Sequence, residues 1–196
     1  MSARFSPRNY GSAFGCAILW STELVREGER DRAMAIVRKW VADQATGFIK
    51  ITDPYFGPED LEMVQLIRST NPSIPIYILS SRKRQQRADV LPPWDDTYRS
   101  HWRLAVSDCD PGDVTVVIVG KRSSGDHPIH DRWWLSETSG LRMGTSANSV
   151  GVGKLSEVSA IDPSEVGNRL TEVDRYLSGS VKECGTDRIL YSSFKL

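Results

Sequence analysis

One segment of the chain gathers side chains that are suited to phosphate chemistry. His130 and Arg132 stand two residues apart, and Ser146 and Asn148 repeat that spacing further on. Residues two apart on a strand point to the same face, so each pair is expected to project into one site. A neutral imidazole attacks phosphorus, whereas a guanidinium, a hydroxyl and an amide hold phosphate oxygens. The carboxylate of Glu157 is expected to hold the second ring nitrogen of His130 and to fix its tautomer.

Further candidate side chains flank this segment. Lys154 follows a glycine-rich turn and is expected to line the site, although the turn lacks the spacing and the following Ser or Thr of a P-loop. Arg82 and Arg84 belong to a basic run after a predicted strand. They either track a phosphate backbone or lie on a solvated loop. Glu137 is expected to play a supporting structural role.

Two aromatic stretches have structural explanations beside functional ones. Asp53 and Tyr55 follow a predicted strand and either border the site or belong to a turn that Pro54 alone explains. Trp133 and Trp134 are adjacent on another predicted strand and therefore face opposite ways. At least one of these tryptophans is expected in the core rather than on a base-stacking surface.

Hydrophobic periodicity predicts the elements that position these side chains. Residues 30–45 repeat apolar positions at helical spacing, and further helices are expected from Pro58, from Pro92-Pro93 to Ala105, and from Ser164. Short apolar and β-branched runs predict strands at 48–53, 74–79, 114–119, 129–135, 140–145 and 154–161. Residues after Gly179 show no firm pattern.

The order of these elements predicts the fold class. A strand, a helix and a second strand follow one another between residues 48 and 79, and such a crossover normally joins parallel strands. We therefore expect an α/β domain with a mixed, mostly parallel β-sheet flanked by helices. The domain is expected at 29–180, after an N-terminal segment at 1–28 and before a C-terminal tail at 181–196.

Composition narrows the class of protein. The 25 Lys and Arg residues are balanced by 25 Asp and Glu residues, which excludes a histone-like binder that relies on its overall charge. Three widely spaced cysteines include no close pair, so a zinc site is not expected and a reduced, cytoplasmic protein is. The longest apolar stretch, residues 13–20, is too short to span a bilayer and is interpreted as a buried segment.

The segment around His130 resembles the signature of the phospholipase D superfamily. The sequence H-D-R-W-W-L-S-E at 130–137 is similar to H-x-K-x4-D, with Arg132 in the place of the lysine and Glu137 in the place of the aspartate. T-S-A-N at 145–148 resembles the G-S-x-N that follows in the family, at a spacing one residue longer, and Glu157 falls near a later acidic residue. D-P-Y-F at 53–56 is similar to an early stretch of such domains. The resemblance covers roughly residues 30–178, one half of a two-motif enzyme.

The resemblance implies a phosphodiesterase. In this family one histidine forms a phosphohistidine and a second protonates the leaving group. Because this chain supplies one motif, the resemblance implies a homodimer that brings two copies of His130 together. Neither a metal nor another cofactor is implied. The leading hypothesis is a metal-independent nuclease that holds nucleic acid through an anion clamp of Arg132, Ser146 and Asn148.

Two other hypotheses remain at this point. A phospholipid head group presents the same diester to the same residues, and some members of the family resemble binding domains without hydrolytic activity. The alternative is therefore a non-catalytic module that binds phosphorylated lipid, nucleic acid or a protein partner. Such a module would also suit a larger defence or mobile-element assembly.

A second H-x-R-x4-D pattern begins at His101. It includes Arg103 and Asp108 but lies on a predicted helix, where residues two apart diverge by about 200°. No S-x-N follows it. We interpret this pattern as part of a helix surface and not as a second active-site motif.

Overall fold

The computed structural model describes residues 22–87 and 93–196, and one β-sheet runs through them. The strand order is β1-β7-β6-β5-β2-β3-β4-β9-β8. The apolar stretch at 13–20 lies outside the described residues. In chain order the strands are β1 Glu23–Val25, β2 Ile49–Thr52, β3 Ile76–Ser81, β4 Val114–Lys121, β5 Trp133–Leu135, β6 Gly140–Met143, β7 Ser156–Ala160, β8 Glu183–Cys184 and β9 Asp187–Lys195.

The sheet is mixed but mostly antiparallel, so the expectation of a mostly parallel sheet was wrong. Among the named strands, β2, β3 and β4 are the ones that pair in parallel, and helices lie between them in the sequence. β5, β6 and β7 follow one another through turns and loops and pair antiparallel. A parallel pair needs a long crossover, whereas a short connection returns the chain in the opposite direction. The single strand-helix-strand unit was therefore not representative of the rest of the chain.

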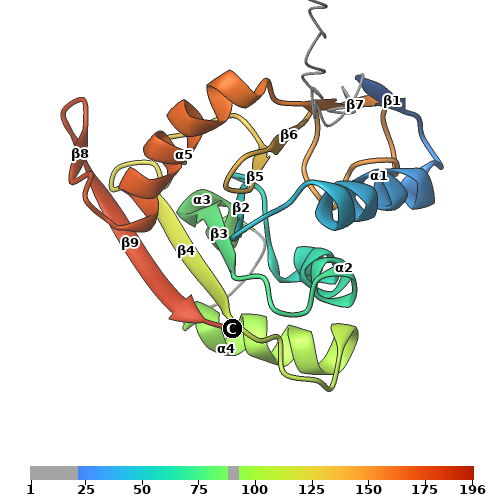
Figure 1. The fold of residues 1–196 in the computed structure, drawn as a ribbon. Coiled ribbons are helices and arrows are strands. Elements are labelled where there is room, and N and C mark those ends of the chain that lie inside the picture. The colour runs from blue at the N-terminus through green and yellow to red at the C-terminus, as the bar shows by residue number, and fades with distance from the viewer. Residues whose placement is uncertain (1–21, 88–92) are drawn as a thin grey trace, which may run out of the picture.

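Helices cover both faces of the sheet (Figure 1). Figure 1 shows α5 on one side, and α1 and α2 on the other. Two short segments of other helix types extend this set: the 3-10 helix η1 and the π-helix η2. The bounds are α1 Arg30–Asp43, η1 Pro58–Leu61, α2 Glu62–Thr70, α3 Arg82–Arg87, α4 Trp94–His101, η2 Trp102–Val106 and α5 Pro163–Leu177.

Alternation along the central strands divides the core into two layers. On β4, Val116 and Ile118 pack in the layer beneath α1, α2 and α4, whereas Val117 and Val119 pack in the layer beneath α5. Both sets are buried because helices cover both faces, which explains the nearly continuous apolar run that predicted this strand. The loops at the ends of the central strands therefore begin from strands that are packed on both faces.

The basic run after β3 forms a helix and not a loop. The Ser81 hydroxyl accepts a hydrogen bond from the backbone N–H of Arg84 at 2.9 Å, as an N-terminal capping residue does. The cap begins α3 at Arg82, immediately after the strand. The basic side chains are thereby placed at the carboxyl end of β3.

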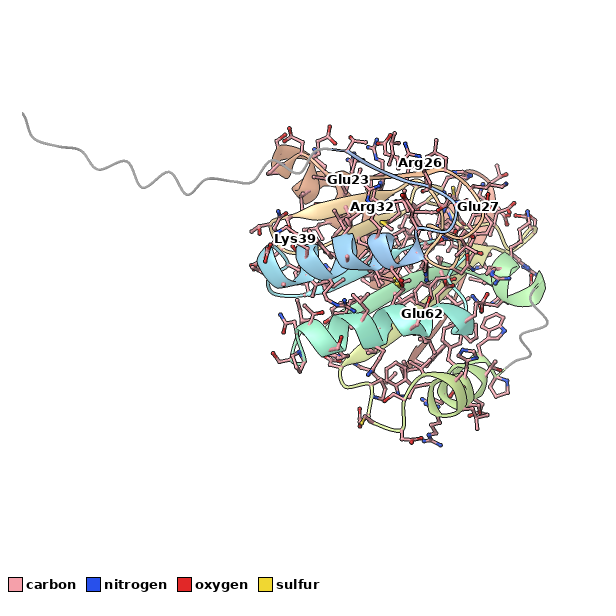
Figure 2. The ribbon with its side chains drawn as sticks, turned by 90° about the vertical axis from the view of Figure 1, so that its right-hand side faces the viewer. Glu23, Arg26, Glu27, Arg32, Lys39 and Glu62 are labelled. Carbon is pink, nitrogen blue, oxygen red and sulfur yellow. The ribbon has the colours of Figure 1, made fainter. Side chains whose placement is uncertain are left out.

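Both ends of the described chain join the sheet. β9 pairs antiparallel with β4 from Lys195 to Ile189, so residues expected to form a tail instead cover one edge of the parallel strands. At the far edge of the whole sheet, β1 pairs with β7. Figure 2 shows Glu23 and Arg32 close together where β1 meets α1, and Arg32 pairs with Glu23 at 2.8 Å and with Glu29 at 3.3 Å. These ion pairs join the edge strand to the helix that follows it.

Candidate functional site: a cationic cleft at the carboxyl ends of the parallel strands

A cleft of about 720 Å³ opens at the carboxyl ends of β2 and β3. The segments that precede β5 and follow β6 reach the same end of the sheet, because β5 runs antiparallel to β2 and β6 runs antiparallel to β5. Ligand sites in α/β sheets commonly lie beyond the carboxyl ends of parallel strands. The predicted site residues that line the cleft are Arg84, His130, Arg132, Ser146, Asn148 and Lys154.

Four residues on one side of the cleft form a connected network, here called the anchored group: Asp53, Arg132, Ser146 and Ala147. Arg132 Nε donates to Ser146 Oγ at 3.0 Å, and Ser146 Oγ donates to Asp53 Oδ1 at 3.1 Å. The backbone N–H of Ala147 donates to Asp53 Oδ2 at 3.0 Å. One carboxylate therefore fixes the loop after β6 and, through the serine, the guanidinium of Arg132.

Asp53 is the buried centre of this group, with 1% of its surface exposed. Burial raises the pKa of its carboxyl above the ordinary value. Backbone N–H groups of Tyr55 and Ala147 and the guanidinium of Arg132, whose Nε lies 3.7 Å from Asp53 Oδ1, act in the opposite direction. The sequence indicated a residue at the border of the site but not its partners, which lie 93 and 94 positions further along the chain.

The loop that carries Ser146 is also held from α1. Arg30 Nη1 donates to the carbonyl of Ala147 and, at 3.1 Å, to the carbonyl of Val150. Gly151 has φ +72°, and a Cβ atom there would lie 2.7 Å from the backbone nitrogen of Arg30. The glycine-rich turn is therefore explained by close packing against the start of α1.

Three other predicted residues line the cleft without such support and are here called the open group: His130, Asn148 and Lys154. The His130 side chain is exposed, and within residues 22–87 and 93–196 its ring makes no hydrogen bond or ion pair. Lys154 is likewise exposed and has no ion pair in the described parts of the chain. The carbonyl of the Asn148 side chain accepts a hydrogen bond from Ser149 Oγ at 2.7 Å. These groups are available to a ligand.

His130 and Arg132 lie just before β5 and not on it, since the strand begins at Trp133. The chain is already extended beside β6 at this point, because the N–H of Met143 donates to the carbonyl of Arg132 at 3.0 Å. Both side chains line the cleft. The two side chains therefore share one cleft, although the strand that was expected at 129–135 is shorter.

Two predicted carboxylates lie away from the cleft. Glu157 is an exposed residue of β7, pairs with Leu24 of β1, and does not line the cleft or contact His130. Glu137 follows β5 at the end opposite to His130, where its N–H donates to the carbonyl of Thr46 at 3.2 Å. The structure thus brings neither carboxylate to the imidazole. No cleft-lining carboxylate replaces Glu157 as a partner of His130 within the described residues.

The basic residues of α3 divide between two directions. The guanidinium of Arg82 lies over the ring of Trp94, 5.0 Å from its centroid, and this residue does not line the cleft. Lys83 and Arg84 do line it, and both are paired with carboxylates. Lys83 pairs with Asp126 at 2.5 Å, and Arg84 pairs with Glu59.

His127 is a cleft-lining residue that the sequence patterns did not indicate. Burial lowers the pKa of its imidazole to about 4, so the ring is neutral at neutral pH. Nδ1 lies 2.9 Å from the backbone nitrogen of Ile129 and 2.5 Å from its oxygen, and Nε2 is buried without a partner. The ring closes the turn that leads to His130. No sequence motif includes it, since its role depends on burial.

No cluster of three or more His, Cys, Asp or Glu side chains suited to a metal ion occurs among the residues that the structure describes. In the same residues, no helix combines the length and the apolar character needed to cross a bilayer.

Comparison with known proteins gives a fold but no sequence family. No family model matches the chain, and no curated protein does. A solved structure titled "Structure of TrmBL2, an archaeal chromatin protein, shows a novel mode of DNA binding" is 12% identical, with a TM-score of 0.46 over 83% of this chain and 54% of that one. NucT from Helicobacter pylori is also 12% identical, with a TM-score of 0.54 over 81% of this chain and 96% of NucT. The likeness to NucT shows that this chain has a phospholipase D-like fold.

Proposed function

We propose that the chain is a nuclease of the phospholipase D type, which binds the phosphodiester backbone of nucleic acid in the cleft and cleaves it through His130. The observation that carries the proposal is the convergence of an accessible imidazole with Arg132, Ser146, Asn148 and Lys154 on one cleft. NucT, which shares the fold, is a nuclease of that superfamily. Site and fold therefore support the same chemistry.

The proposed reaction has two steps. A ring nitrogen of His130 attacks phosphorus, a P–N bond forms, and the P–O bond to the leaving nucleoside breaks as a second imidazole gives its proton to the departing oxygen. Water then attacks phosphorus, the P–N bond breaks, and the second imidazole accepts the proton of the water. The guanidinium of Arg132 is the group placed to hold the phosphate oxygens throughout.

The second imidazole is proposed to be His130 of another copy of this chain. Within the described residues, His127 is the other histidine of the cleft, and its Nε2 is buried while Nδ1 contacts the backbone. A buried neutral ring with a pKa of about 4 is a poor proton donor at neutral pH. A two-fold homodimer would bring two exposed copies of His130 together across its axis.

The first test is cleavage in EDTA. Labelled single- and double-stranded DNA and RNA are incubated with the wild-type chain, His130→Ala and His101→Ala. His101 is the matched control, because it begins the similar pattern on α4 but does not line the cleft. We expect cleavage by the wild type and by His101→Ala, with a loss of at least about 1000-fold in His130→Ala because the nucleophile is removed. Equal cleavage by all three proteins would contradict the proposal.

The second test concerns the homodimer and the covalent intermediate. Light scattering across a range of concentrations should give twice the mass of the chain under the conditions that support cleavage. A phosphorus-labelled substrate, quenched in alkali, should leave label on the wild type and none on His130→Ala. An active monomer would disprove the shared two-histidine site, and its acid-base group would then have to be sought within one chain.

A non-catalytic binding module is the second candidate, and one observation favours it. No carboxylate orients the His130 ring within the described residues, although the second nitrogen of a catalytic imidazole is usually held by such a partner. A binding module would hold an oligonucleotide without cutting it. Its affinity would survive His130→Ala and fall in Arg132→Ala, since an anion clamp depends on the cation more than on the imidazole.

A further inference from the structure

Tyr55 differs from the other aromatic residues near the cleft in its exposure. It is 44% exposed and lines the cleft, and it is the one strongly exposed aromatic side chain in the described ranges. Trp134 is 1% exposed and belongs to the core. The ring of Trp133 faces the guanidinium of Arg169, 5.1 Å from its centroid, and Trp133 Nε1 is buried. An aromatic surface for a ligand is therefore offered by the tyrosine and not by the tryptophans.

The backbone of Tyr55 is held in place on both sides. Its N–H donates to Asp53 Oδ1 at 2.9 Å, and its carbonyl accepts from Arg84 Nε at 3.0 Å. The preceding carbonyl, of Pro54, accepts from the hydroxyl of Ser81 at 2.5 Å. An exposed aromatic ring on a turn with this many contacts is a preorganised surface, because little backbone freedom is lost when a ligand binds to it.

The ring also lies next to the group proposed to hold phosphate. Arg132 Cζ is 5.0 Å from the centroid of the Tyr55 ring, within the range of a cation–π contact, while Arg132 Nε is bonded to Ser146. One guanidinium of the anion clamp thus contacts both Ser146 and the aromatic ring. In a nucleic acid, a phosphate and the base of the adjoining nucleotide are separated by about one sugar, a spacing that such a neighbouring pair of sites can accommodate.

We propose that Tyr55 stacks on an unpaired base of the nucleotide adjoining the clamped phosphate, so that the cleft takes single-stranded nucleic acid. The inference rests on the proposed function and adds the class of substrate. A base inside a duplex is already stacked on both faces, whereas a splayed base of a single strand has a face to offer. Phosphate contacts to Arg132 and Lys154 would supply affinity for any strand, and Tyr55 would supply the preference for a single strand over a duplex.

The test compares three fluorescent DNA probes of equal length: a single strand, the same backbone with abasic sites throughout, and a duplex. Binding in EDTA at fixed salt is measured for the full chain carrying His130→Ala, so that the probes stay intact. We expect the single strand to bind about tenfold more tightly than the abasic strand, the size of one stacked base. Tyr55→Leu should remove that difference, Tyr55→Phe and Tyr55→Trp should keep it, and the abasic probe should bind within about twofold to all of them.

Leu104→Ala is the control variant, because Leu104 is 87% exposed and does not line the cleft. It should leave all three affinities unchanged. An equal loss for the base-containing and abasic strands in Tyr55→Leu would overturn the inference, since the ring would then act only by supporting Arg132. Equal binding of single strand and duplex would overturn it as well. If none of the probes bound, the proposed function itself would fall, whereas binding of all three with no base dependence would remove the stacking site alone.

Discussion

The two halves of the cleft are built in opposite ways. In the anchored group, a buried carboxylate binds Ser146 and the Ala147 N–H, and the serine in turn accepts a hydrogen bond from Arg132. In the open group, His130 and Lys154 are exposed, and neither makes an ion pair within the described residues. The cation is thus positioned before a ligand arrives, whereas the imidazole is not.

This difference indicates which property each half contributes. A guanidinium that is already held in place loses little conformational entropy when it binds an anion. The anchored group therefore favours tight and specific binding. An imidazole without a partner reaches its reactive orientation only when a substrate or a second chain supplies contacts. We therefore expect stability to depend on the anchored group and turnover to depend on the open group.

The largest effect expected on stability is that of Asp53→Ala. The change leaves the Ala147 N–H, the Tyr55 N–H and the Ser146 hydroxyl without their acceptor in a buried place. Urea unfolding should show a loss of about 3 kcal/mol, the usual size for breaking a buried polar network. His130→Ala should change the free energy of unfolding by less than about 0.5 kcal/mol, because its ring is exposed. Similar losses in the two variants would remove the contrast between the groups.

A second effect concerns pH and the carboxyl of Asp60 on η1, a residue with 0% exposure. Burial, together with the nearby charge of Asp53, raises its pKa from 3.8 to about 7, so between these values the folded chain holds a proton that the unfolded chain has lost. The contribution of this carboxyl to the free energy of unfolding therefore falls as pH rises from about 4 to 7. Asp60→Asn should remove that fall. Between pH 5 and pH 8, its free energy of unfolding should rise by about 2 kcal/mol relative to that of the wild type.

The readout is the difference between the two unfolding curves and not either curve alone. His127 changes stability in the opposite direction: its pKa falls from 6.5 to about 4 on folding, so its contribution is lost as pH falls through that range. Both proteins in the comparison contain His127, and its effect cancels. Parallel pH profiles for wild type and Asp60→Asn would show that the carboxyl is not the group that titrates.

The smallest expected effect concerns a cation of α3 that is paired with a carboxylate. The prediction is that breaking the pair makes this cation available to a ligand in the cleft. Arg84 is bound to Glu59, and Glu59→Gln should release it toward the cleft. Affinity for a single-stranded oligonucleotide at low salt should rise about twofold, as expected for one exposed ion pair. Glu165→Gln is the matched control, since it removes the same charge from the pair with Arg169 on α5. An equal rise in affinity in both variants would show that the change in net charge, and not the release of Arg84, causes the effect.

The sequence predicted those elements whose periodicity reports burial. α1 buries Ala33, Val37, Trp40 and Val41 at helical spacing, and β4 is apolar because both of its faces are covered. β9 was missed because Ile189 is its only buried residue, so its nine residues carry no clear alternation. Periodicity also reports nothing about strand direction, which is why the balance of parallel and antiparallel pairs was wrong.

The site was predictable where neighbours in the chain are also neighbours in space. His130, Arg132, Ser146 and Asn148 flank the β5–β6 hairpin, and a hairpin brings its two ends together. Glu157 follows a longer connection, and the pattern gave no means of telling that it would pair with β1. The bond between Asp53 and Ser146 joins two distant segments, and no local pattern encodes it.

The strand order pairs segments that lie far apart in the chain. β1 pairs with β7, although residue 23 and its partner 158 are far apart in the chain, and β4 must wait for residues 189–195 before its outer edge is covered. Contacts of this range are slow to form, because the entropy of closing a long loop is lost before any packing is gained. The outer edge of β4 therefore stays uncovered until β9 pairs with it, and an uncovered edge strand is prone to pair with another chain.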